Sequence, residues 1–214
     1  MVELTPPTIT KLAIEVSPGT RCQEATITFP VRGNEVLLGM KKRGHGVNYL
    51  NGFGGKLQPG ETPLDATVRE LKEESGLEAD PSAIKPTGIL TVMGSGKPMV
   101  IYLSRCLSWQ GTPEETEEMR PAWFTVGHKL TNGTFANQLP LETMWPNDRL
   151  WIIAAILGCK ACYNLTVTNN LTILQTTLPH ADDPWQPHGP QPPEAIHQNL
   201  SMQQLSCEKA KNTR

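Results

Sequence analysis

The alternation of apolar and polar residues predicts that strands make up much of this chain. Runs rich in valine, isoleucine, threonine and aromatic residues, bounded by glycine, proline and asparagine, are typical of strands. Turns are expected at Arg32-Gly33-Asn34 and at Gly94-Ser95-Gly96-Lys97-Pro98. Strands are predicted at residues 25–31, 35–41, 88–93, 99–107 and 122–126.

One stretch in the first half has the features of a helix. No glycine or proline interrupts Leu64–Ser75, and Pro63 fits the first helical position, where its missing N–H costs nothing. Either Glu61 or Thr62 can act as the N-cap. Gly76 is placed to end the helix, since glycine tolerates the left-handed conformation found there.

The second half predicts one more helix and a hairpin. This helix is expected to begin at a cap, Asn147 or Asp148, and to end at Leu157, followed by Gly158. The other segments are predicted as a polar loop at residues 128–138 and a hairpin of strands at 163–168 and 171–177.

These elements predict an α/β protein in which helices lie around a mixed sheet, as in an α/β sandwich. The folded domain is expected to span residues 23–178, and residues 1–22 are interpreted as a polar N-terminal extension. Beyond the domain, proline, glutamine and histidine dominate and large apolar residues are few. The tail at residues 179–214 is therefore predicted to be disordered.

Charge and hydropathy narrow the classes of partner. The net charge is −2 and the pI is about 6.2, so the chain lacks the basic footprint expected for binding polymeric nucleic acid. The longest apolar stretch, Leu150–Leu157, is too short to cross a membrane, and the first residues lack the pattern of a secretory signal. We expect a cytoplasmic monomer, with the nuclear and mitochondrial pools as open alternatives for its location.

The cysteines predict no disulfide framework. There are five of them, an odd and scattered set. Cys159 and Cys162 have the spacing of a redox or zinc pair, but no second pair or histidine couple stands beside them. A structural role is favoured over a functional one, and the compartment is expected to be reducing.

Candidate chemistry is concentrated in the segment Gly55–Leu77. On the predicted helix, Glu70, Glu73 and Glu74 stand at i, i+3 and i+4 and share one face. Such a cluster is either a solvated acidic face or a site for a hard cation, because carboxylate oxygens suit Mg2+ or Mn2+. The glycine-rich approach Gly52-Phe53-Gly54-Gly55-Lys56 favours the metal site.

Written as a pattern, this segment reads G-x5-E-x7-R-E-L-x-E-E-x-G-L. Because it fills every specified position of the Nudix box, the chain resembles the Nudix hydrolases, which cleave nucleoside diphosphates linked to another group, usually with magnesium. The resemblance implies the Nudix fold, an α/β/α sandwich with a mixed sheet. Over about residues 24–178 the chain is also similar to the eukaryotic MutT homologues, in blocks at residues 36–44, 51–56, 110–113, 118–124 and 144–148.

The resemblance implies hydrolysis of oxidised purine nucleoside triphosphates, such as 8-oxo-dGTP and 2-oxo-dATP, by attack of water on the β-phosphorus. The expected cofactor is Mg2+, with Mn2+ as an alternative, and the expected partner is the nucleoside triphosphate. The implied catalytic residues are Glu73, Glu74 and Arg69, the last orienting the glutamates and pairing with Glu61. The implied metal ligands are Gly55, Glu70, Glu73, Glu74 and Glu118. The implied substrate-binding residues are Thr26, Lys41, Asn51, Gly54, Lys56, Met99, Trp145, Asn147 and Asp148.

Two of these assignments keep a plainer alternative. Glu118 belongs to an acidic run, Glu114–Glu118, and is either a metal ligand or base, or one more surface acid. Lys41-Lys42-Arg43 and Lys56 either contact the phosphates or form an ordinary basic strand end.

The base pocket departs from the resembled family at several positions. The family reads the purine with an asparagine and two adjacent aspartates, and here Asn147 replaces the first aspartate beside Asp148. Because an amide does not titrate, substrate choice is expected to depend less on pH than it does with two adjacent aspartates. Aromatic positions of the family are occupied by His45, Leu90 and Val92, so stacking should weaken and the preference for oxidised purines should relax.

Three functions stay open at this level. The leading one is an oxidised purine nucleoside triphosphate diphosphatase that sanitises the nucleotide pool. The second is a Nudix enzyme for an ordinary or methylated dNTP, ADP-ribose or capped RNA. The third is a non-catalytic Nudix-fold binding module, which the intact glutamate set argues against. The block Trp145–Asp148 favours the first, because Trp145 is interpreted as the base-stacking residue and Trp151 as core.

Overall fold

The computed structural model describes residues 22–94, 97–126, 128–129, 135–136, 139–167 and 172–177. Apart from Cys22, the predicted N-terminal extension lies outside this part of the chain, as does the predicted disordered tail at residues 179–214. Within the described part, no helix is long and apolar enough to cross a membrane.

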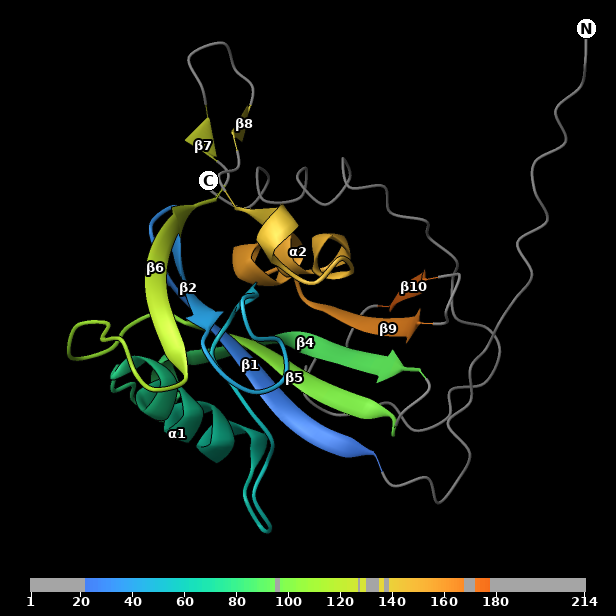
Figure 1. The fold of residues 1–214 in the computed structure, drawn as a ribbon, viewed down its shortest axis with the longest axis horizontal. Coiled ribbons are helices and arrows are strands. Elements are labelled where there is room, and N and C mark those ends of the chain that lie inside the picture. Colours follow the sequence, from blue (N-terminus) through green and yellow to red (C-terminus); the bar gives the residue numbers. More distant parts are fainter. Residues whose placement is uncertain are drawn as a thin grey trace, which may run out of the picture.

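A mixed sheet, which has eight strands within the described residues, forms the centre of the molecule (Figure 1). Strand β1 (Gln23–Arg32) runs parallel to β5 (Met99–Cys106), which is antiparallel to β4 (Ile84–Met93). On its other side β4 is parallel to β9 (Ala161–Val167), and β10 (Thr172–Thr177) closes that edge. The predicted mixture of parallel and antiparallel strands is confirmed.

The other end of the sheet carries the segments that lead to the candidate site. Strand β2 (Glu35–Lys41) pairs with β1 at their shared turn and then with β3 (Leu50–Asn51) and β6 (Met119–Thr125), all antiparallel. The loop between β2 and β3 and the loop before β6 therefore leave the sheet next to each other.

Two helices cover the sheet on opposite sides, α1 (Pro63–Ser75) and α2 (Ile152–Leu157) (Figure 1). Strand β2 shows the period-2 pattern that this requires. Val36 and Leu38 are buried in the cluster that contains α2, whereas Leu37 is buried in the cluster that contains α1. Both faces of this strand are therefore core, which explains its continuous apolar run.

Helix α1 begins and ends where the sequence predicts. Thr62, one of the two expected caps, accepts a hydrogen bond from the backbone N–H of Asp65, whose carboxylate bonds back to complete a capping box. At the other end, Gly76 is left-handed with φ 74° and its N–H donates to Lys72. These caps fix the last turns of α1, where the glutamates lie.

The second predicted helix is shorter than expected. A 3-10 turn, Asp148–Leu150, comes first, and the chain leaves helical geometry at Trp151, with φ −135°, before α2 begins at Ile152. The indole of Trp151 is 2% exposed and packs beside Phe29. We attribute the break to the burial of this large ring, which tertiary packing favours over a continuous helix, and the expected core role of Trp151 is confirmed.

Two further boundaries differ from the prediction. The expected loop at residues 128–138 contains a small antiparallel pair, β7 (His128–Lys129) and β8 (Phe135–Ala136). Strand β4 begins at Ile84 rather than residue 88, although it contains Pro86. Pro86 pairs with Ser104 of β5 next to an irregularity in the register, and pairing with β9 starts only at Gly88, so Pro86 has a strand on one side alone, where proline is tolerated. Short 3-10 turns also occur at Pro81–Ala83 and Leu141–Thr143.

Candidate active site

The glycine segment lies directly against the carboxylates of α1. The N–H of Gly54 donates to Glu74 Oε2 at 2.8 Å. A Cβ at Gly55 would lie 2.4 Å from Glu70 Oε1, so the Glu70 carboxylate occupies the space that a larger residue would take here. The glycine segment and the acidic face of α1, both singled out in the sequence, therefore lie together in the structure.

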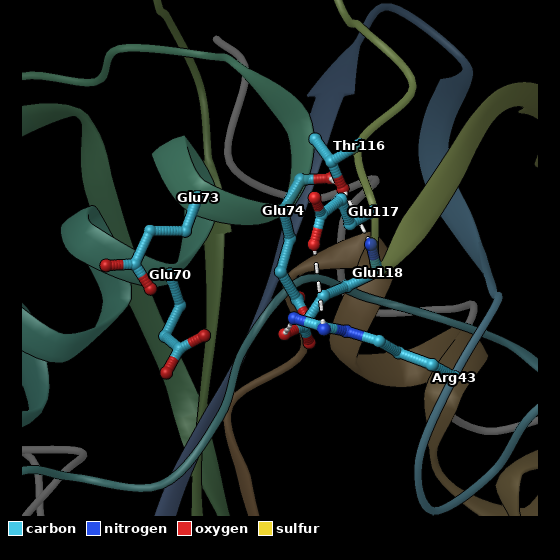
Figure 2. A pocket seen from close by; sticks show the side chains of 7 residues that line it. All are labelled: Arg43, Glu70, Glu73, Glu74, Thr116, Glu117 and Glu118. Atoms are coloured by element: carbon cyan, nitrogen blue, oxygen red, sulfur yellow. Dashed lines mark hydrogen bonds and ion pairs between the residues drawn. The ribbon is translucent and has the colours of Figure 1, made fainter.

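A pocket of about 390 Å3 opens between the end of α1 and the loop before β6. Figure 2 shows Glu70 and Glu73 along one side, with Glu74, Glu118 and Arg43 on the other. The full lining is Arg43, Glu70, Glu73, Glu74, Thr116, Glu117 and Glu118. Glu118 thus joins the box glutamates in one pocket although it lies more than forty residues further along the chain.

Arg69 neutralises one side of this pocket. Its guanidinium holds Glu61 through Nε and Nη2, at 2.7 and 2.9 Å, in a bidentate pair. Nη1 donates to Glu70 at 2.8 Å and to Glu73 at 3.1 Å. Since a bidentate pair is both strong and directional, Arg69 is anchored on Glu61 and fixes the two glutamates from there. The expected Arg69–Glu61 pair is confirmed.

The basic strand end is paired with acids. Lys41 Nζ lies 3.7 Å from Glu74, and Lys42 Nζ lies 2.7 Å from Glu115. Arg43 contacts Glu117 at 3.7 Å and Glu118 at 2.5 Å. Lys41 and Arg43 therefore reach carboxylates that line the pocket and balance part of its charge, whereas the Lys42 pair lies outside the lining.

Burial raises the pKa of two of the pocket glutamates, Glu70 and Glu74. Glu74 is 2% exposed, and burial raises its pKa to about 7 against the opposing effects of the Gly54 N–H and Lys41. Burial also raises the pKa of Glu70, with the charges of Glu73 and Glu118 adding to the shift and Arg69 opposing it. A divalent cation would relieve this repulsion, because carboxylate oxygens are its preferred ligands.

The donor set therefore fits Mg2+ or Mn2+ in its chemistry. In the arrangement described, however, no three His, Cys, Asp or Glu side chains among the described residues converge closely enough to form a metal cage. Arg69 holds Glu70 and Glu73, and Arg43 holds Glu118. In each of these ion pairs the arginine contacts one carboxylate oxygen, so a cation would be held through the other oxygen or would take the place of the arginine.

The candidate base-reading block lies around the 3-10 turn that precedes α2. Asp148 is 6% exposed and accepts a hydrogen bond from the Trp145 N–H at 3.3 Å. Burial raises the pKa of Asp148 to about 7, with that N–H opposing the shift. Asn147 is partly buried beside it, and Asn51 accepts the N–H of Gly52 through its side-chain oxygen at 2.8 Å.

The other residues predicted to contact the substrate lie in two places, near the glycine segment and against the core that contains α2. Thr26 alternates with Ala25 and Ile27, which pack in the core that contains α2, so its buried side chain points to the opposite face. Its carbonyl lies against Gly54, which leaves the backbone of Thr26 near the glycine segment. Lys56 continues that segment and accepts from Arg69 through its carbonyl. Leu90 and Val92 occupy positions that are aromatic in the resembled family. Leu90 is buried in the core that contains α2, and Val92 and Met99 are partly buried against the same core.

Sequence reasoning missed Tyr49. Its ring stacks on Trp145 with centroids 4.5 Å apart and an interplanar angle of 6°. His45 stacks on the same indole at 5.1 Å and 21°. The signal that could have found Tyr49 is its place, two residues before Asn51, in a loop already known to carry His45.

Comparison with known proteins identifies the family of this chain. The NUDIX domain model matches residues 23–138. The oxidized purine nucleoside triphosphate hydrolase of Mus musculus is 37% identical over 159 residues, which are 73% of this chain and 94% of the mouse protein. The protein of the same name from Danio rerio is 40% identical over 126 residues, which are 59% of this chain and 74% of the fish protein.

Solved structures show the same fold. The MutT protein of Bacillus halodurans superposes with a TM-score of 0.55 at 19% identity, covering 71% of this chain and 97% of that one. A NUDIX hydrolase from Nitrosomonas europaea gives a TM-score of 0.50 at 13% identity, covering 69% and 80%. The predicted Nudix sandwich is confirmed, and the chain belongs to the NUDIX domain family of hydrolases.

Proposed function

We propose that this hydrolase converts oxidised purine nucleoside triphosphates, such as 8-oxo-dGTP and 2-oxo-dATP, to the monophosphate and pyrophosphate with Mg2+. The observation that carries the proposal is the gathering of Glu70, Glu73, Glu74 and Glu118 in one pocket (Figure 2). The names of the relatives from Mus musculus and Danio rerio support the substrate class. The buried Asp148 beside a partly exposed Trp145 supports a purine as the base.

The glutamates and the Gly55 carbonyl would hold the cation, which when bound neutralises phosphate charge and acidifies a coordinated water. Glu74 suits a fixed ligand, because Gly54 and Lys41 hold its two oxygens. Glu73 is the candidate base, since its side chain is 58% exposed and can reach a water molecule. Arg69 positions Glu73 while leaving it accessible.

Substrate positioning is divided between two ends of the site. Lys41 and the Gly54–Lys56 backbone lie at the carboxylate end, where they can contact phosphates. Arg43, once released from Glu118, adds a bidentate donor there. At the other end Trp145 offers its ring to the base, and the side chains of Asn51, Asn147 and Asp148, with Met99, complete the proposed pocket. Asp148, when ionised, accepts from the N1–H and amine of a guanine.

The test is pyrophosphate release with Mg2+ from 8-oxo-dGTP, 2-oxo-dATP, O6-methyl-dGTP and dGTP at matched low concentrations. We expect kcat/KM to be highest for an oxidised purine, though the aliphatic Leu90 and Val92 should narrow its margin over dGTP. Equal or faster turnover of dGTP or O6-methyl-dGTP would mean that the protein is a Nudix enzyme for an ordinary or methylated dNTP instead. No turnover of any of the four would contradict the proposal and make ADP-ribose and capped RNA the next substrates.

Base choice is expected to depend on pH through Asp148. Below pH 7 this carboxyl is protonated and donates, and above pH 7 it is ionised and accepts. The ionised fraction, which accepts from guanine N1–H, rises about tenfold between pH 6 and 8, while the protonated fraction, which donates to adenine N1, falls about tenfold. The ratio of kcat/KM for 8-oxo-dGTP to that for dATP should therefore rise by up to about 100-fold over this range. Taking the ratio cancels the titration of Glu74, which acts on both substrates.

Asp148→Asn is the matched variant for this experiment. It should flatten the pH profile of the ratio, and a profile that keeps its slope in this variant would assign the titration elsewhere. The expectation from sequence, that Asn147 weakens the pH dependence, considered an amide beside an ordinary aspartate. Burial of Asp148 adds a titration near neutral pH that the sequence argument did not include.

A further inference from the structure

Trp145 is held by an aromatic ring from another part of the chain. Tyr49 stands at the end of the loop between β2 and β3, and its ring stacks nearly parallel to the indole, at 6° and 4.5 Å between centroids. Both rings are partly buried. His45, from the middle of the same loop, stacks less closely and is exposed. Tyr49 is thus the closer and better-buried partner of Trp145.

The backbone of the loop fixes where the Tyr49 ring can go. The Lys41 N–H donates to the Tyr49 carbonyl at 2.9 Å, and the Tyr49 N–H donates to the Gly46 carbonyl at 3.0 Å. Between them, Asn48 takes a left-handed conformation with φ 68° and donates to Lys41. A Cβ at Gly46 would already be 3.3 Å from the indole, so the loop has little freedom to move closer.

The indole has its own fixed point on the other segment. Its backbone N–H is held by the buried Asp148, and the preceding Met144 is 2% exposed. These contacts fix the main chain of Trp145, whereas the plane of its ring is set by what stacks on it. Offset stacking adds energy beyond buried area and favours parallel planes at this separation.

We propose that Tyr49 is a positioning residue that sets base specificity: its ring holds the Trp145 indole in the plane against which the purine stacks. The inference rests on the proposed function and deepens it, because it names a residue outside the resembled purine-reading set. It makes purine affinity depend on the aromatic ring of Tyr49 and leaves the carboxylate pocket untouched. The phenolic hydroxyl has no part in it.

The test compares Tyr49→Leu and Tyr49→Phe in the full chain. Tyr49→Leu should raise KM for 8-oxo-dGTP by about fivefold with kcat within about twofold, because only stacking is lost. It should raise KM for dCTP less, since a pyrimidine overlaps the indole less. Tyr49→Phe should restore the KM of the wild-type protein. Val47→Ala is the matched control, because Val47 lies in the same loop, 44% exposed.

A second readout needs no turnover. The indole 1H–15N signal of Trp145, assigned with Trp145→Phe, should shift in Tyr49→Leu and keep its position in Tyr49→Phe and Val47→Ala. An unchanged KM and indole signal in Tyr49→Leu would overturn the inference, as would a Tyr49→Phe variant as impaired as Tyr49→Leu. If the wild-type protein hydrolyses no purine triphosphate, the proposed function fails. The Kd of 8-oxo-dGTP, read from the same signal, then tests Tyr49 by the same fivefold criterion.

Discussion

Exchanging Glu73 for glutamine is expected to lower kcat for nucleotide hydrolysis by about 100-fold or more, with little change in stability. The amide has the same shape but carries no charge for a cation and cannot accept a proton from water. Because the Glu73 side chain is 58% exposed, the substitution leaves no buried group unpaired. Pyrophosphate release under saturating 8-oxo-dGTP and Mg2+ measures the effect.

Glu78→Gln is the matched control for this variant. Glu78 is also 58% exposed, and it pairs with Lys72 of α1 at 2.7 Å, yet it does not line the pocket. It should keep the kcat of the wild-type protein within about twofold, since exposed ion pairs contribute little. Similar losses in both variants would mean that the total negative charge on and near α1, rather than the Glu73 carboxylate itself, supports turnover.

Replacing Gly54 by alanine is expected to lower the free energy of unfolding by at least about 3 kcal/mol. A Cβ there would lie 1.9 Å from the Thr26 carbonyl oxygen, which belongs to the backbone of a central strand and cannot rotate away. The segment would have to separate from β1, which would also break the Gly54–Glu74 hydrogen bond. Urea denaturation followed by circular dichroism measures the loss.

Gly60→Ala separates this clash from the general cost of losing a glycine. Gly60 has φ +81°, and no atom lies within 4 Å of the place that an alanine methyl group would take, so the cost is that of the left-handed backbone, about 1 kcal/mol. Equal destabilisation in the two variants would contradict the close approach at Gly54. An active Gly54→Ala protein with normal stability would do so more directly.

Much of this architecture can be predicted from local sequence. Helix α1 is specified by Thr62, Pro63 and Gly76, whose effects act within one or two turns, so its bounds agree with the prediction. Helix α2 was predicted too long because the break at Trp151 depends on a distant partner, Phe29. Strand β4 was predicted too short because whether Pro86 fits a strand depends on where the neighbouring strands lie, and β9 begins to pair only at Gly88.

In the site, too, the features set by local sequence could be predicted, whereas those set by distant contacts could not. The glutamate face of α1 follows from helical spacing, so its clustering could be predicted. That Arg43 reaches Glu118 and that Lys41 reaches Glu74 depends on how β2 and β6 pair, which spacing does not reveal. The raised pKa of Asp148 depends on burial, and Tyr49 depends on a loop conformation. These features therefore follow from the three-dimensional structure and could not be predicted from the sequence.

The order of the strands has a consequence for how fast this chain folds. The parallel pairs join distant segments, with Gln23 opposite Met99 and Gly88 opposite Ala161. Pairings this remote in sequence close large loops before they gain contacts, and folding on the order of milliseconds to seconds is typical of such topologies. The glycine segment hydrogen-bonds to β1 through the Thr26 N–H and the Gly55 carbonyl. A newly made chain therefore completes its carboxylate pocket only after β1 has found its place.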